Sequence, residues 1–174
     1  KAQWTIHPDG MATLDYTYNF SGVVDLMGIC FDYPEEQVLS KRWLGAGPYR
    51  VWQNRIHGTQ YDIWENDYND PIPGETFNYP EFKGYFGSVS WMSIRTKEGT
   101  ISLTNETPDS YIGVYQPRDG RDRLLYTLPG SGISVLNVIP PVRNKVNSTD
   151  LCGPSSQPKW VDGPQTGRLV LRFE

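Results

Sequence analysis

Cysteine and histidine are scarce in this chain of 174 residues, which has two of each. Cys30 and Cys152 lie far apart and match no CxxC or Cys-His spacing, so the sequence lacks the ligand pattern of a zinc site. Two isolated cysteines do not establish a disulfide, and free thiols are the expectation. We expect no metal ion and no cofactor.

Long apolar runs and clusters of basic residues are also missing. No run approaches the ~20 residues of a membrane span. The formal net charge is −4 and the Lys and Arg residues are scattered. Neither nucleic acid nor a membrane is therefore an expected partner. The chain lacks a GxSxG nucleophile motif and a glycine-rich phosphate loop as well.

Helical periodicity is nearly absent. No segment of helical length carries an apolar stripe at a spacing of 3.6 residues. The one helical candidate is residues 34–44, "PEEQVLSKRWL", and an extended conformation fits these residues about equally well. Little or no helix is expected.

Aromatic residues, glycine and proline are what the sequence has in quantity. Aromatics make up 13% of the chain, and 17 Gly and 14 Pro are spread along it. Frequent glycine and proline favour short strands joined by turns. Large side chains with a polar edge suit both β-sheet cores and sugar-binding faces.

Strict alternation marks several strands. In residues 13–20, "TLDYTYNF", the apolar Leu14, Tyr16, Tyr18 and Phe20 alternate with polar residues, as in a half-buried strand. The preceding "HPDG" predicts a hairpin over residues 4–18. Further strands are predicted at 61–65, 87–96, 99–105, 111–116, 124–128, 132–139 and 167–174. The expected fold is one all-β domain over residues 1–174, an antiparallel β-sandwich of roughly ten or more strands.

The carboxylates do not form a recognisable catalytic pair. Hydrolysis of a glycosidic bond requires two carboxyl groups at a defined separation. Most Asp and Glu residues stand among Gly, Pro and Asn, where turns or solvation explain them. Glu81 is the exception, because "YPEFKGYF" surrounds it with aromatic residues. No catalytic residue is assigned.

The segment 43–55, "WLGAGPYRVWQNR", carries the strongest local signal. Gly45, Gly47 and Pro48 predict a turn, and Trp43 is expected in the core. Sugars present apolar C–H faces that stack on aromatic rings, and their hydroxyl groups pair with polar side chains.

Strand alternation after the turn would place Arg50, Trp52 and Asn54 on one face. The predicted carbohydrate-binding residues are Arg50, Trp52, Asn54, Arg55, His57 and Glu81. The alternative is that Trp43 and Trp52 both belong to the core and that the arginines support loops. The sequence leaves both interpretations open.

Residues 41–55, "KRWLGAGPYRVWQNR", resemble a motif in the C-terminal β-sandwich domain of glycoside hydrolase family 2 β-galactosidases. The segments 4–20, 78–96, 132–139 and 167–173 resemble further parts of that domain in the same order. The resemblance implies a galactose-mutarotase-like supersandwich. It also implies that the catalytic glutamates lie in an upstream barrel that is absent from these residues. We expect the chain to be the C-terminal fragment of a larger glycoside hydrolase. The localisation of the chain is left open, and the parent enzyme is expected to be periplasmic or secreted.

In the family, a loop of this domain can supply an aromatic residue to the active site. Val135 stands where that residue would be sought, so the sequence departs from the pattern there. The expected function is a non-catalytic domain that shapes the substrate cleft and contributes to carbohydrate binding. Its partners would be carbohydrate and the other domains of the parent glycosidase.

Two alternatives remain. The chain could be an autonomous carbohydrate-binding module that uses the residues around Trp52. It could also be a mutarotase-like epimerase, which needs a general acid and base facing one sugar carbon. His57 with Glu81 is the pair the sequence offers for that chemistry.

Overall fold

The computed structural model of the chain describes residues 1–67, 84–114, 132–141 and 152–174. Within these ranges the chain forms thirteen strands, and its helical content is limited to two short 3-10 turns, η1 (Glu35–Gln37) and η4 (Pro154–Ser156). The predicted all-β fold with little or no helix is confirmed. The segment 34–44 is extended from Val38 onward.

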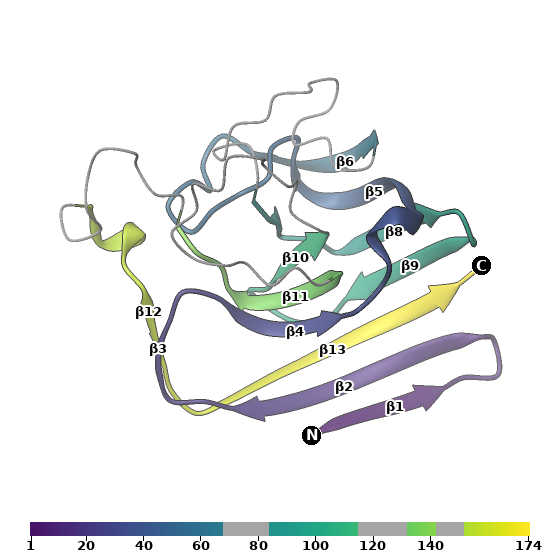
Figure 1. The fold of residues 1–174 in the computed structure, drawn as a ribbon, viewed down its shortest axis with the longest axis horizontal. Coiled ribbons are helices and arrows are strands. Elements are labelled where there is room, and N and C mark those ends of the chain that lie inside the picture. Colours follow the sequence, from purple (N-terminus) through teal and green to yellow (C-terminus); the bar gives the residue numbers. More distant parts are fainter. Residues whose placement is uncertain (68–83, 115–131, 142–151) are drawn as a thin grey trace.

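The larger sheet has seven antiparallel strands in the order β1-β2-β13-β9-β8-β5-β6 (Figure 1). The strand bounds are β1 (Ala2–Ile6), β2 (Met11–Asn19), β13 (Pro164–Phe173), β9 (Thr100–Asn105), β8 (Trp91–Thr96), β5 (Val38–Gly47) and β6 (Gln60–Asp67). The hairpin predicted over residues 4–18 is confirmed, with Trp4 opposite Leu14 in the β1–β2 pair.

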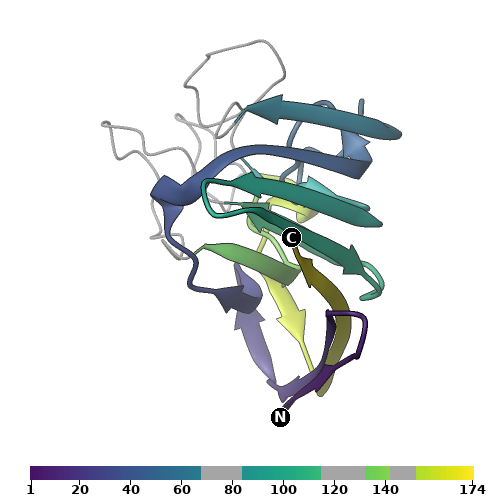
Figure 2. The ribbon, with the colours of Figure 1, turned by 90° about the vertical axis from the view of Figure 1, so that its right-hand side faces the viewer.

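The second layer is a four-stranded antiparallel sheet in the order β4-β11-β10-β7. Its strands are β4 (Met27–Phe31), β11 (Ile133–Val138), β10 (Tyr111–Val114) and β7 (Phe86–Gly87). A separate ribbon pairs β3 (Gly22–Val24) with β12 (Lys159–Val161). Seen from the side, the four-stranded sheet lies against one face of the seven-stranded sheet (Figure 2). This arrangement is the predicted sandwich.

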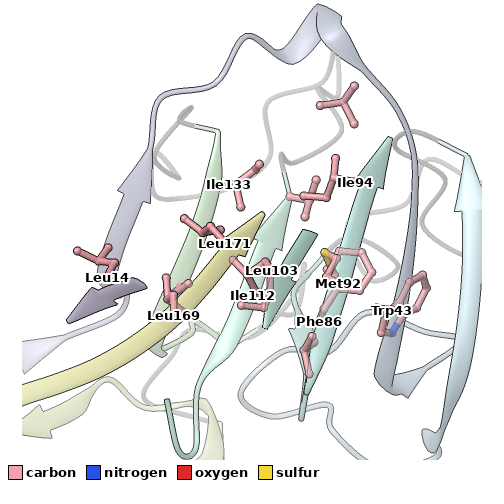
Figure 3. Close-up of a cluster of buried hydrophobic side chains, with 14 of the residues drawn as sticks. Leu14, Trp43, Phe86, Met92, Ile94, Leu103, Ile112, Ile133, Leu169 and Leu171 are labelled. Carbon is pink, nitrogen blue, oxygen red and sulfur yellow. The ribbon is translucent and has the colours of Figure 1, made fainter. Parts of the chain in front are cut away.

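The main core fills the space between the two sheets (Figure 3). Alternation explains its composition, because each strand sends every second side chain inward. Leu14 and Leu169 stand opposite each other on β2 and β13, and both are buried. Trp43 is fully buried and meets the ring of Phe86 edge-on at 4.7 Å between centroids. The expected core position of Trp43 is confirmed.

The glycines after Trp43 have a different role from the predicted one. The prediction that Gly45 and Gly47 build a turn is wrong, because β5 continues through both and pairs with β6 as far as Gly47. A Cβ at Gly45 would lie 3.0 Å from the carbonyl oxygen of Gly87, and one at Gly47 would overlap the indole of Trp64. Both positions need glycine for close packing, and the turn begins at Pro48.

Neither Cys30 nor Cys152 takes part in a disulfide, which agrees with the expectation of two thiols. In the part of the chain that the structure covers, no helix has the length and apolar character needed to cross a membrane.

Candidate functional site

Five of the six predicted site residues lie in the loop that joins β5 to β6. We call residues 48–59 the corner loop. It lies between Gly47 and Gln60, which pair with each other at the adjoining ends of β5 and β6. Glu81, the sixth residue, lies outside the described residues. The corner loop therefore decides how much of the predicted site exists as one surface.

Two of the predicted residues are buried. Arg50 is 3% exposed, and its guanidinium carbon lies 5.0 Å from the centroid of the Phe86 ring. Trp52 is fully buried and packs edge-on against Tyr85 at 5.7 Å between ring centroids. The prediction that Trp52 faces a cleft is wrong, since its ring has no open face for a sugar. The alternative that Trp52 belongs to the core is confirmed.

Strand alternation fails here because residues 50–55 do not form a strand. The amide and carbonyl of Val51 exchange hydrogen bonds with those of Tyr85, at 2.7 and 2.9 Å. The backbone of Trp52 closes a tight turn with that of Arg55, at 3.2 and 2.9 Å. Consecutive residues can therefore both point inward, as Val51 and Trp52 do.

A second, smaller core lies beneath the corner loop. It consists of Val51, Trp52, Tyr85, Leu136 and Ile139, with Leu26 and Tyr111 packed beside it. Burial raises the pKa of the Tyr111 hydroxyl, and the negative charge of Asp109 raises it further, so this phenol stays protonated at neutral pH. The loop thus rests on an apolar base that fixes its backbone.

Gln53 and Asn54 connect the corner loop to the segment around η4. The Nε2 group of Gln53 donates hydrogen bonds to the carbonyls of Ser155 and Gln157, both at 2.8 Å. The Nδ2 group of Asn54 donates to the Ser156 hydroxyl, also at 2.8 Å. Asn54 therefore joins two parts of the chain about one hundred residues apart. Sequence reasoning gave no signal for this pairing.

The remaining predicted residues, Arg55 and His57, are exposed. Tyr49 and Ile56, which are 46% and 43% exposed, belong to the same loop. We call Tyr49, Arg55, Ile56 and His57 the exposed rim. The rim offers an aromatic ring, a guanidinium and an imidazole, which can bind a hydroxyl-bearing ligand.

The corner loop does not itself bring together the two carboxyl groups that glycoside hydrolysis requires. The corner loop contains neither Asp nor Glu. Among the residues the structure describes, no hydrogen bond or ion pair joins His57 to a carboxylate, and no group of three or more His, Cys, Asp or Glu side chains could hold a metal ion.

Val135, where the resemblance would place an aromatic contact, is fully buried in β11. Its side chain belongs to the main core. No ligand contact can come from this position in the described arrangement.

No family model matches this chain, and no curated protein matches it.

Proposed function

We propose that this chain is a non-catalytic β-sandwich domain that contributes to carbohydrate binding in a glycosidase of the type that residues 41–55 resemble. The sugar contacts assigned to it are the side chains of the exposed rim. Arg50, Trp52 and Asn54 then act as supports that hold the rim in place.

The observation that supports the proposal is that a loop held in place by hydrogen bonds carries the exposed rim, whose side chains can stack on sugars and hydrogen-bond to them. The corner loop is fixed by the Val51–Tyr85 backbone pairing and by the two hydrogen bonds from Gln53. A loop ordered in advance loses little conformational entropy when a ligand binds. Tyr49 supplies an apolar ring face, and Arg55 and His57 supply hydrogen-bonding nitrogen atoms.

The non-catalytic part of the proposal follows from the carboxylates. Both routes of glycoside hydrolysis need a pair of carboxyl groups beside the scissile bond, and the corner loop has none. The epimerase alternative needs Glu81 beside His57 and stays a prediction. Turnover of a chromogenic β-galactoside by the purified chain, or faster interconversion of galactose anomers, would contradict a non-catalytic role.

Calorimetric titration with galactose and with short β-1,4-linked galacto-oligosaccharides tests the binding role. We expect Arg55→Ala and His57→Ala each to weaken binding by about fivefold or more. Lys97→Ala, which removes another exposed cation, is the matched control and should bind like the unaltered chain. If none of these sugars produces heat, the binding role fails.

A second candidate, an autonomous carbohydrate-binding module, is favoured by a different surface. The outward face of the seven-stranded sheet presents apolar and polar side chains in ordered rows. A module that works alone would need such a surface in addition to one loop.

A further inference from the structure

The seven-stranded sheet has one face turned away from the core (Figure 2). Trp43 and Met92 stand opposite each other and point inward, where both are buried. Leu44 follows Trp43 and Trp91 precedes Met92, and these two residues also stand opposite each other. Because successive side chains of a strand point to opposite faces of the sheet, Leu44 and Trp91 both point outward. The same alternation fixes the outward side chains on every strand of the sheet.

Pairing between strands arranges these outward side chains in rows that cross the sheet. The first, which we call the apolar row, is Ile63, Leu44, Trp91, Thr104 and Val170, from β6, β5, β8, β9 and β13. The second, which we call the polar row, is Glu65, Arg42, Ser93, Ser102 and Arg172, from the same strands in the same order. Neighbouring strands lie about 4.8 Å apart, so each row is roughly 19 Å long.

The two rows lie side by side and are open to solvent. Ile63 is 48% exposed, and Trp91 is half-buried. Arg42 and Arg172 are exposed near opposite ends of the polar row. Beyond the apolar row, Tyr61 is 58% exposed, and its hydroxyl lies 2.6 Å from that of Ser90. The result is a strip with one apolar edge and one hydrogen-bonding edge.

We infer that the two rows form a binding strip for an uncharged polysaccharide that lies across the strands. The C–H faces of successive sugar units would pack on Trp91, Leu44 and Ile63. Their hydroxyl groups would meet the donors and acceptors of the polar row, since Arg donates, Glu accepts and Ser does both. The inference rests on the proposed function for the class of ligand, but it places the contact on a different surface.

The composition of the strip favours a glycan over a protein partner. Serine is depleted in protein–protein interfaces, whereas Ser93 and Ser102 occupy the middle of the polar row, with Thr104 beside them. Short hydroxyl side chains lose little rotamer entropy on binding. Because these side chains are short, they also leave room for an extended chain at the centre of the strip.

The charges favour an uncharged polysaccharide over an acidic one. The polar row carries two arginines and one glutamate, and the Nε of Arg172 lies 2.8 Å from a carboxylate oxygen of Glu174. The local charge is thus close to balanced. Because the whole chain has a net charge of −4, a polyanion would be repelled on approach.

Affinity electrophoresis of the full chain tests the inference. Native gels would contain β-1,4-galactan, xyloglucan or polygalacturonate. We expect retardation by at least one of the two neutral polymers, little change with added salt, and tighter binding as oligosaccharides of the retained polymer lengthen from two units to six. Trp91→Ala and Arg42→Ala should each reduce the affinity by about fivefold or more.

Matched controls come from exposed residues outside the strip. Trp160 is 71% exposed on β12, and Lys97 is an exposed cation between β8 and β9, so Trp160→Ala and Lys97→Ala should leave retardation within about twofold of the unaltered chain. Since removing the half-buried Trp91 costs packing, Ile63→Asp provides an independent probe of the apolar row. Circular dichroism would verify that each variant is folded, and Ile63→Asp should also weaken retardation.

Three results would contradict the inference, and each can be told from the others. If Arg55→Ala abolishes binding while folded Arg42→Ala and Ile63→Asp bind normally, the corner loop holds the sugar; the strip fails and the proposed function stands. Retardation by polygalacturonate alone contradicts an uncharged ligand. If neither the polymers nor the galactosides bind, both proposals fail together.

Discussion

The hydroxyl of Tyr18 donates a hydrogen bond to the side-chain carbonyl of Asn137 at 2.7 Å. Tyr18 lies on β2 of the seven-stranded sheet, and Asn137 lies on β11 of the four-stranded sheet. This contact joins the two layers of the sandwich through a directional bond between side chains. The ring of Tyr18 also stacks with that of Tyr16, at 6.3 Å between centroids.

Tyr18→Phe should lower the free energy of unfolding by about 1 kcal/mol, because it leaves the Asn137 oxygen without its donor. Urea denaturation at neutral pH measures the change. Tyr61→Phe is the matched control, since it also removes a hydrogen-bonded hydroxyl but from an exposed side chain. Its effect should be smaller, and equal effects would contradict a special role for the contact between layers.

The same tyrosine predicts a loss of stability at alkaline pH. Burial raises the pKa of Tyr18 to about 12, and the neighbouring Tyr16 adds to the rise. An unfolded tyrosine titrates near pH 10, so the unfolded chain loses this proton first. The stabilising contribution is therefore complete below about pH 10 and is lost as the pH rises towards 12.

Urea midpoints measured between about pH 9 and pH 12 should fall for the unaltered chain. Burial also raises the pKa values of Tyr16 and Tyr111, so part of the fall should persist in Tyr18→Phe. The slope of that variant should nevertheless be shallower. A slope as steep as that of the unaltered chain would show that Tyr18 does not contribute.

Gly47→Ala should destabilise the fold by about 1–3 kcal/mol, because its Cβ would overlap the indole of Trp64 and force a shift in packed groups. Thermal and urea unfolding measure the loss. Gly153→Ala is the control, since a Cβ there meets nothing within 4 Å. If Gly47→Ala is as stable as the control, close packing does not explain this glycine.

Gln53→Ala should loosen the segment around η4. The substitution removes two hydrogen bonds, to the carbonyls of Ser155 and Gln157, and should cost about 1–2 kcal/mol. Amide hydrogen exchange should become faster at Ser156 and Gln157, whose amides bond locally within η4. Gln60→Ala, at an exposed residue of β6, should leave those rates unchanged.

Much of the fold was predictable because side-chain alternation is a local property. The pattern of residues 13–20 and that of 167–173 each mark an inward face, and Leu14 and Leu169 meet across β2 and β13. Alternation does not tell which strands pair. The neighbours of β13 are β2 and β9, and nothing in the local sequence indicates them.

The candidate site was predicted less well, for a physical reason. Burial of Arg50 and Trp52 depends on Tyr85 and Phe86, which reach the corner loop from another part of the chain. The glycines at 45 and 47 look the same in sequence whether they allow a turn or admit a neighbouring side chain. A surface role for Trp91 was not predictable from the sequence, because only the register of β5 and β8 places it in a row with Leu44.

The central place of β13 has a consequence for how the protein is made. The hairpin of β1 and β2 joins the larger sheet only through residues 164–173. During synthesis from the N-terminus, that hairpin cannot join the larger sheet until β13 has left the ribosome. Until then β2 and β9 both present unpaired edges, which are prone to pairing with other chains. A nascent chain of this kind is therefore most exposed to aggregation just before β13 emerges.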